Sequence, residues 1–186
     1  MSALLRFQSV ACIRGGRLLF EGLDLELGPG EALHVTGPNG SGKSSLIRLA
    51  AGLLRPAAGR VAQGAKAALA DEHLALDREL ALRRALAFWV DGAPLQRGLE
   101  AMGIAALRDV PVRLLSAGQA RKARLARVVA SDGKIWLLDE PLNGLDSEGG
   151  ARLAGAIATH RLAGGAVLAA SHQDFAKDWR TLELGA

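Results

Sequence analysis

The pattern of hydrophobic and polar positions predicts a strand, a loop and a helix in the first part of the chain. Residues 23–27 (LDLEL) alternate between apolar and acidic side chains, as in a half-buried strand. After the turn GPGE, residues 32–36 (ALHVT) form an apolar run that we interpret as a buried strand. Residues 45–54 (SLIRLAAGLL) have the composition of a helix, and Pro56 and Gly59 end this pattern.

The middle of the chain has a helical pattern between residues 77 and about 112. Four apolar residues there share one face at helical spacing, namely Leu82, Ala85, Leu86 and Trp89. Residues 116–131 predict another helix, in which Ser116 is placed as the N-cap.

The last third of the chain predicts two more buried strands around a helix. Residues 134–139 (KIWLLD) and 166–171 (AVLAAS) are short apolar runs typical of interior parallel strands. Residues 152–163 between them are helical and end at Gly164-Gly165. The order of these elements predicts an α/β fold with a mainly parallel core sheet. We expect a small N-terminal antiparallel piece of two strands and a helical subdomain at about residues 76–130, within a single domain of residues 1–186.

Composition narrows the class of protein. The chain has 186 residues, enough for one domain with a sizeable core. Its longest unbroken apolar run has six residues, 85–90, whereas a membrane span needs about 20. We therefore expect no membrane span, and the start of the chain does not have the pattern of a secretory signal. The single cysteine, Cys12, fits a reducing cytoplasm.

The net charge of +4 raises the question of an anionic partner. A basic chain can bind nucleic acid or an anionic membrane surface. However, the chain has no run of five or six basic residues, aromatic residues make up 4%, and tyrosine is absent. We attribute the excess charge to nucleotide anions and solvation, and we expect no nucleic-acid partner.

Residues 37–44 match the phosphate-loop pattern G-x-x-x-x-G-K-[ST]. Glycines in such a loop let backbone N–H groups converge on phosphate oxygens, and the following helix directs its positive end at the same anion. Lys43 would reach the β and γ phosphates, and the Ser44 hydroxyl would ligate Mg²⁺. The predicted nucleotide-binding residues are Gly37, Pro38, Asn39, Gly40, Ser41, Gly42, Lys43 and Ser44.

Two carboxylates, Asp139 and Glu140, end the strand predicted at residues 134–139. Strand ends of a parallel sheet meet the ligand crevice. We expect Asp139 to hold the magnesium ion, directly or through water, and Glu140 to accept a proton from the attacking water. Without the phosphate loop, the same pair would be an ordinary solvated turn before Pro141.

A second glycine motif, LSAGQ at residues 115–119, precedes a basic helix. A serine, a glycine and a helix N-terminus form an anion-binding device, although the motif alone could be a capped helix start. Because the phosphate loop already serves one phosphate group, a second device is redundant within one chain.

Taken together, GPNGSGKS, LSAGQ, IWLLDE, NGLD and SHQ resemble the ATP-binding-cassette ATPases in sequence and order, over nearly the whole chain. This resemblance implies a phosphate-loop NTPase fold, ATP and Mg²⁺ as cofactors, and ATP hydrolysis. In that family two cassettes pack head to tail, and ATP lies between the phosphate loop of one and the signature motif of the other. Ser116, Ala117, Gly118 and Gln119 would then complete the partner's site.

The resemblance also assigns roles to two residues that are uninformative alone. Asp146 of NGLD matches the loop that couples the two sites of the family's dimer. His172 of SHQ matches the switch histidine that contacts the γ-phosphate and orients the water, whereas a lone histidine is more often structural. Other phosphate-loop classes, such as nucleotide kinases, do not explain residues 115–119.

The chain departs from the family pattern at two positions. Residues 70–76 (ADEHLAL) lack the family's magnesium-contacting glutamine, and His73 stands at about its place. The aromatic residue that usually stacks on adenine is also missing, and Arg14 and Gly15 lie near that position. Arg14 could stack its guanidinium on the base instead.

Within the family, the chain is most similar to the ATP-binding subunits of cytochrome c maturation systems, which are linked to haem export. This similarity implies a homodimer at the cytoplasmic face of the bacterial inner membrane, beneath a hydrophobic permease of the CcmB type and with a protein of the CcmC type. No direct haem binding is expected, because the chain has no Cys-x-x-Cys-His motif. A soluble cassette, the ATPase of another small exporter and an ATP-binding switch with little turnover are the alternatives.

Overall fold

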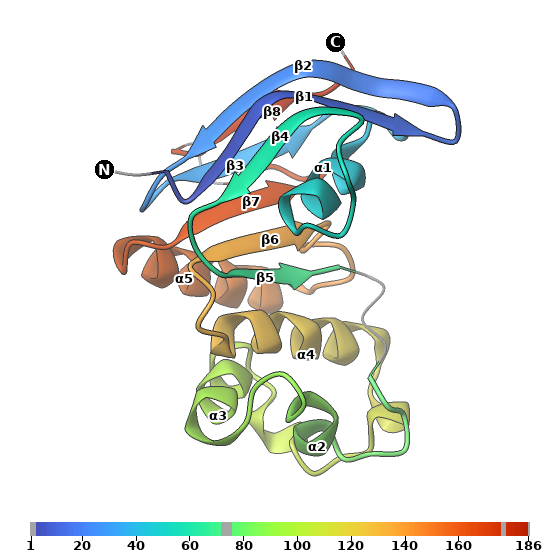
Figure 1. Ribbon diagram of the computed structural model, residues 1–186. Coiled ribbons are helices and arrows are strands. Elements are labelled where there is room, and N and C mark those ends of the chain that lie inside the picture. Colours follow the sequence, from blue (N-terminus) through green and yellow to red (C-terminus); the bar gives the residue numbers. More distant parts are fainter. Residues whose placement is uncertain (1–2, 72–75, 176–177, 186) are drawn as a thin grey trace. The chain divides into compact units, whose positions relative to one another are not determined.

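The computed structural model describes residues 3–71, 76–175 and 178–185, which form two compact units (Figure 1). The first unit comprises Met1–Leu69, Gly133–Pro141 and His160–Ala186. The second comprises Ala70–Asp132 and Leu142–Thr159. The strands are β1 (Leu5–Arg14), β2 (Arg17–Leu27), β3 (Ala32–Thr36), β4 (Ala58–Gln63), β5 (Ala67–Ala70), β6 (Ile135–Asp139), β7 (Ala166–Ala170) and β8 (Arg180–Glu183). The helices are α1 (Lys43–Ala50), α2 (Leu82–Leu86), α3 (Gly92–Ala101), α4 (Ala117–Ala130) and α5 (Ser147–Leu162), with short 3-10 turns η1 (Ala105–Leu107) and η2 (Val112–Leu114).

A five-stranded sheet of order β5-β6-β7-β3-β8 forms the centre of the first unit. The pairs β6–β7, β7–β3 and β3–β8 are parallel. The predicted strands at residues 32–36, 134–139 and 166–171 are therefore confirmed, with β6 starting and β7 ending one residue inside the predicted bounds. Their buried, apolar character follows from their place inside a parallel sheet.

The N-terminal β piece has three strands, not the predicted two. Its order is β2-β1-β4, and both pairs are antiparallel. The prediction missed β4 because its side chains are exposed or half-buried, so its sequence has no hydrophobic run. Phe7 of β1 shows the register, since it lies opposite both Leu25 and Val61.

The core of the first unit lies around α1, between the two sheets (Figure 1). Leu46, Ile47, Leu49 and Ala50 of α1 are all buried there. Leu33 and Val35 of β3 face this core, so the alternation of a strand directs His34 between them to the opposite face of the sheet. This arrangement holds the N-terminus of α1 at the carboxyl end of β3.

The second unit is helical, and the helical prediction for residues 77–112 is correct only in part. Leu82, Ala85 and Leu86 are buried in α2 as predicted. Trp89 lies beyond the end of α2 and is 39% exposed. Because α2 ends at Leu86, its helical spacing does not extend to Trp89. The guanidinium of Arg127 on α4 lies 5.4 Å from the centroid of the Trp89 ring.

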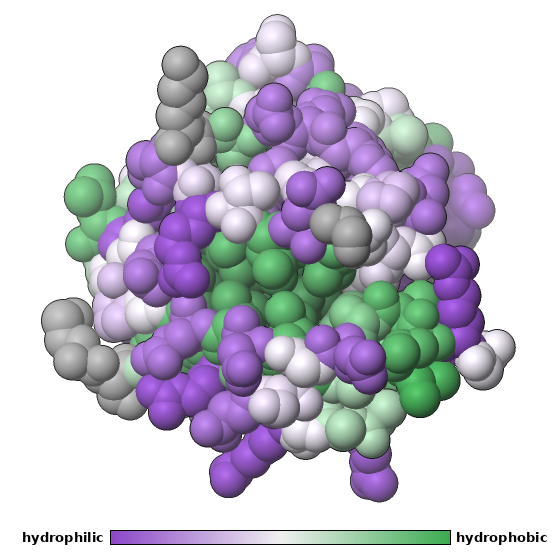
Figure 2. All heavy atoms as spheres, turned by 90° about the horizontal axis from the view of Figure 1, so that it is seen from above, coloured by the Kyte–Doolittle hydropathy of each residue, from purple (hydrophilic) through white to green (hydrophobic). Residues whose placement is uncertain are grey.

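The hydropathy of the helices and of the surface further characterises the fold. Among the described residues, no helix is both long and apolar enough to span a bilayer. Seen from above, the surface has an apolar area near its centre that hydrophilic side chains surround (Figure 2). The large hydrophobic residues that are most exposed are Ile13, Leu18, Leu53, Phe88, Leu114 and Leu162.

Candidate active site

The phosphate loop connects β3 to α1 in the first unit, and its glycines make its path possible. Gly37 has φ 134°, and a Cβ there would lie 2.3 Å from the carbonyl oxygen of Leu184. Gly42, the N-cap of α1, has φ 108°. Residues with side chains rarely adopt these conformations, so the loop can pack against the β8 end and still turn into the helix.

Lys43 stabilises the loop from inside. Its Nζ donates to the carbonyl oxygens of Gly37 and Pro38 at 2.8 and 3.1 Å, and the residue is 7% exposed. The first N–H groups of α1 have no partner within the helix, so they and the ammonium group present positive charge at one place. Ser41 Oγ is buried and has no partner among the described residues. The loop thus has the donors that a polyphosphate requires.

Ser44 and Asp139 meet at the carboxyl edge of the parallel sheet. Ser44 Oγ donates to Asp139 Oδ1 at 3.0 Å. Hydroxyl and carboxylate oxygens are the ligands that Mg²⁺ prefers, and Mg²⁺ usually has only one or two protein ligands beside phosphates and water. The pair therefore fits a nucleotide-bound magnesium ion.

Glu140 and His172 lie together beside this pair. Glu140 is in a left-handed backbone conformation, with φ 46°, and its N–H donates to the carbonyl of Ala170 at 2.8 Å. Its Oε2 accepts from the backbone N–H of His172 at 3.4 Å. The ring Nε2 of His172 lies 2.9 Å from Asn39 Oδ1, so this imidazole bridges the Glu140 region to the phosphate loop.

The second glycine motif begins α4 in the second unit. Ser116 is the N-cap: its Oγ accepts from the N–H of Gln119 at 3.2 Å, and Gln119 Oε1 accepts from the N–H of Ser116 at 2.9 Å. This capping box confirms Ser116 as the predicted helix start. A Cβ on Gly118 would lie 3.2 Å from the carbonyl oxygen of Gly144, so the NGLD loop lies directly against the start of α4, where Ala117 is the first helical residue.

Asp146 joins the NGLD loop to α4. Its carboxylate is 2.9 Å from the Nζ of Lys122 and accepts from the N–H of Gly149 at 2.8 Å. The hydrogen bond from Lys122, and then that from Gly149, hold the pKa of Asp146 below its ordinary value. Asp146 is therefore ionised near neutral pH and fixes the start of α5.

The remaining predicted residues have less defined surroundings. Arg14 is the exposed last residue of β1, opposite Arg17 across the hairpin turn. His73 lies outside the described residues. The sequence analysis missed two contacts, Asn39 with His172 and Lys122 with Asp146, because neither pair has a sequence spacing that would indicate proximity.

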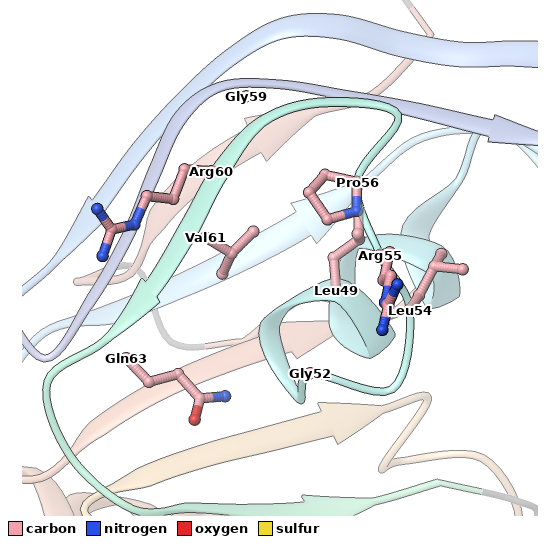
Figure 3. A pocket seen from close by; sticks show the side chains of 9 residues that line it. All are labelled: Leu49, Gly52, Leu54, Arg55, Pro56, Gly59, Arg60, Val61 and Gln63. Atoms are coloured by element: carbon pink, nitrogen blue, oxygen red, sulfur yellow. The ribbon is translucent and has the colours of Figure 1, made fainter.

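A separate cavity of about 470 Å³ lies at the opposite end of α1 from the phosphate loop. Figure 3 shows its wall, which combines Leu49 and Arg55 around the end of α1 with Val61 and Gln63 of β4. Since α1 has eight residues and rises about 1.5 Å per residue, this cavity does not belong to the phosphate site.

Comparison with known proteins identifies the family. The ABC transporter family pattern matches residues 20–143. A cytochrome c biogenesis ATP-binding export protein, CcmA, from Sphingopyxis alaskensis is 60% identical over 177 residues, covering 92% of this chain and 91% of its own length. The CcmA protein of Zymomonas mobilis is 50% identical, with 98% of this chain and 85% of its own length covered.

Solved structures agree on the fold. The ATP-binding subunit of an ABC transporter superimposes with a TM-score of 0.85 at 20% identity, covering 97% of this chain and 85% of that one. A dimeric ATP-binding cassette in a post-hydrolysis state, bound to ADP and Pi, gives a TM-score of 0.78 at 20% identity, with 91% and 88% covered. These findings confirm the resemblance that the sequence motifs indicated. The chain therefore belongs to the ABC transporter family and is an ATPase subunit of the CcmA type.

Proposed function

We propose that this chain hydrolyses Mg·ATP within a head-to-tail pair of identical subunits and thereby drives an export step of cytochrome c maturation. The observation that carries the proposal is the contact of Glu140 with His172 and of His172 with Asn39 of the phosphate loop. It brings a carboxylate, an imidazole and a phosphate cradle to one edge of a parallel sheet, as hydrolysis of a bound nucleotide requires.

The phosphate loop holds the nucleotide in this proposal. Residues 37–44 surround the β and γ phosphates with backbone N–H groups, and Lys43 neutralises their charge. Ser44 and Asp139 hold Mg²⁺, which supplies charge neutralisation on the phosphates when it is bound. Arg14 faces the base.

Glu140 and His172 act on the attacking water. Glu140 accepts its proton, and the hydrogen bond from the His172 N–H keeps the carboxylate oriented. His172 leaves Asn39 when nucleotide enters and directs its ring at the γ-phosphate. The left-handed backbone of Glu140 supports this role, since strained conformations of non-glycine residues are concentrated at functional sites.

A second copy of the chain completes each site. The capped N-terminus of α4 offers the Ser116 hydroxyl and free N–H groups to a phosphate. Asp146 forms an ion pair with Lys122 of the same helix and couples the two nucleotide sites of the pair. Residues 1–186 act as a single cassette, with the helical subdomain at about residues 76–130.

The membrane partner supplies the path for export. We infer a hydrophobic permease of the CcmB type and a CcmC-type protein, with this chain peripheral at the cytoplasmic face of the inner membrane and haem as the exported group. Identity of 60% to a CcmA protein over nearly its full length supports this assignment. Haem does not bind this chain itself in the proposal.

The experiment compares the wild type with Glu140→Gln. The variant retains the shape of the side chain but not its basicity, so we expect ATP-dependent dimerisation in light scattering with phosphate release lowered about 100-fold or more. Glu148→Gln on the exposed surface of α5 is the matched control and should hydrolyse ATP normally. Wild-type turnover in Glu140→Gln would refute the assigned base. Absence of turnover in the wild type together with its membrane partner would favour an ATP-binding switch.

A test of the partner uses affinity purification from membranes. We expect a polytopic permease to copurify with this chain from the membrane fraction. It should not copurify from a fraction that lacks membrane proteins. Copurification with ribosomes or DNA instead would contradict the export role and favour a soluble cassette.

A further inference from the structure

We infer that His34, a buried histidine in the middle of β3, is a positioning residue for the hydrolytic step, acting through the peptide group between Ser171 and His172. No motif indicated this residue, and the proposed function assigns it no contact with the nucleotide. The inference rests on the proposed roles of Glu140 and His172.

The first step is the contact itself. His34 Nε2 lies 3.0 Å from the carbonyl oxygen of Ser171. Because a carbonyl oxygen only accepts hydrogen bonds, Nε2 carries the proton and donates. Both residues are buried, with His34 5% and Ser171 1% exposed, so this hydrogen bond does not compete with bulk water.

The second step is what the same peptide group does on its other side. The N–H of that peptide belongs to His172 and donates to Glu140 Oε2 at 3.4 Å. A peptide group is planar, so its C=O and N–H turn together. The C=O of this peptide group accepts a hydrogen bond from His34, and its N–H donates one to the Glu140 carboxylate. By fixing the C=O, His34 therefore also fixes the N–H that orients the carboxylate. A hydrogen bond accepted by the C=O also strengthens the N–H as a donor.

The third step is the rigidity of the surroundings. The N–H of Ser171 donates to the carbonyl of Val35 at 3.3 Å, and its hydroxyl accepts from the N–H of Gln173 at 2.9 Å. The His34 ring meets Phe175 edge-on, at 5.0 Å between centroids, and Phe175 stacks on Trp179 at 4.3 Å. The imidazole thus has a fixed orientation, as an anchor must.

The consequence is a link between the strand that enters the phosphate loop and the strand that leads to His172. β3 and β7 are parallel neighbours, with His34 opposite Ala169. The backbone pairing of β3 with β7 continues past the end of β7 to the N–H of Ser171, and the side chain of His34 extends it by one further peptide group. That peptide group is the one from which the His172 side chain begins its approach to the phosphates.

The test separates positioning from folding. In His34→Leu the donor is lost, and we expect kcat for ATP hydrolysis to fall about 10-fold, while the apparent KM for ATP changes less than about twofold. In His34→Gln the side-chain amide retains an N–H donor of similar reach and should restore kcat to within about threefold of the wild type. If His34→Leu does not fold by circular dichroism, His34→Asn, whose amide is one methylene too short, takes its place.

His160→Leu is the matched control. This histidine also lies in the first unit, and its Nε2 approaches a backbone carbonyl, that of Lys134, at 3.2 Å. Lys134 precedes β6, whereas Asp139 ends that strand and Glu140 follows it. The control should lose thermal stability but not kcat.

The outcomes are distinct. Equal kcat in the wild type and His34→Leu, equal loss in His34→Gln and His34→Leu, or a similar kcat loss in His160→Leu would each overturn the inference. In a Glu140→Gln background, His34→Leu should lower the residual rate no further, because both changes act on one carboxylate. An additive loss would contradict the pathway through Glu140. Failure of the wild type to hydrolyse ATP would instead refute the proposed function.

Discussion

The Ser44 hydroxyl donates a hydrogen bond to the Asp139 carboxylate, with 3.0 Å between Oγ and Oδ1, although the residues are 95 positions apart in sequence. Ser44 is the last residue of the phosphate loop and lies in the first turn of α1, whereas Asp139 ends β6. Because carboxyl ends of parallel strands share one edge of a sheet, the two oxygens reach the same point. This relationship supports a shared magnesium ion.

The Ser44–Asp139 pair predicts a specific magnesium dependence. Ser44→Ala removes one ligand oxygen, so the Mg²⁺ concentration for half-maximal ATPase activity should rise about 10-fold. Ser44→Thr retains the hydroxyl and should remain close to the wild type. Steady-state phosphate release over a range of Mg²⁺ concentrations measures both. An unchanged magnesium requirement in Ser44→Ala would exclude this residue as a ligand.

Ser116 has a helix-capping role and a proposed phosphate-binding role, and two substitutions separate them. Ser116→Ala loses the cap and should lower the free energy of unfolding by about 1 kcal/mol. Ser116→Asp retains an N-cap acceptor, so stability should stay near that of the wild type. However, its negative charge would oppose a phosphate, so ATP-dependent dimerisation should fail more completely than in Ser116→Ala.

Denaturant unfolding and light scattering with ATP are the two measurements for Ser116, both in the Glu140→Gln background. If Ser116→Asp dimerised as well as its parent, the second glycine motif would be a helix cap and nothing more.

The proposed stacking of Arg14 on the base predicts that its loss affects the binding of ATP and of inorganic triphosphate differently. If its guanidinium stacks on the base, Arg14→Ala should weaken ATP binding several-fold but leave the binding of inorganic triphosphate nearly unchanged. Arg17→Ala, the cross-strand neighbour at the same hairpin, is the control and should bind both ligands normally. Isothermal titration calorimetry provides the affinities, and equal losses for ATP and triphosphate would argue against stacking.

The lowered pKa of His160 predicts that the protein loses stability in mild acid. Its ring stacks on Trp136 at 4.0 Å between centroids, and burial, opposed by hydrogen bonds with the Lys134 and Ala166 backbone, lowers its pKa below the ordinary 6.5. Below that pH the unfolded chain binds this proton more readily than the folded protein does. The free energy of unfolding should therefore decrease as the pH falls through 6.5 toward the lower folded pKa.

The variant His160→Phe tests this pH dependence, because it retains an aromatic ring against Trp136 but cannot titrate. Its free energy of unfolding should decrease less than that of the wild type between about pH 7.5 and 5.5. Parallel curves for the two proteins, from urea unfolding at each pH, would show that His160 does not titrate differently on folding.

Local sequence determined much of the fold. The runs at residues 32–36 and 134–139 predicted buried strands without further context, because a strand covered on both faces is apolar along most of its length. The phosphate loop is equally local, since its glycines and lysine act within eight consecutive residues. Ser116 capped its helix as predicted, because a capping box spans only one turn.

Tertiary structure alone decided how distant segments meet. β4 pairs with β1 although α1 and two strands lie between them in the sequence. The exposed side chains of β4 give no periodic signal. The contacts of His34 with Ser171 and of Asn39 with His172 each join residues more than 130 positions apart. Sequence spacing determines proximity only within a helix turn or a hairpin, whereas strand order in a sheet brings such residues together. Motifs therefore predicted which side chains carry the chemistry, and the sheet determined which of them share a hydrogen bond.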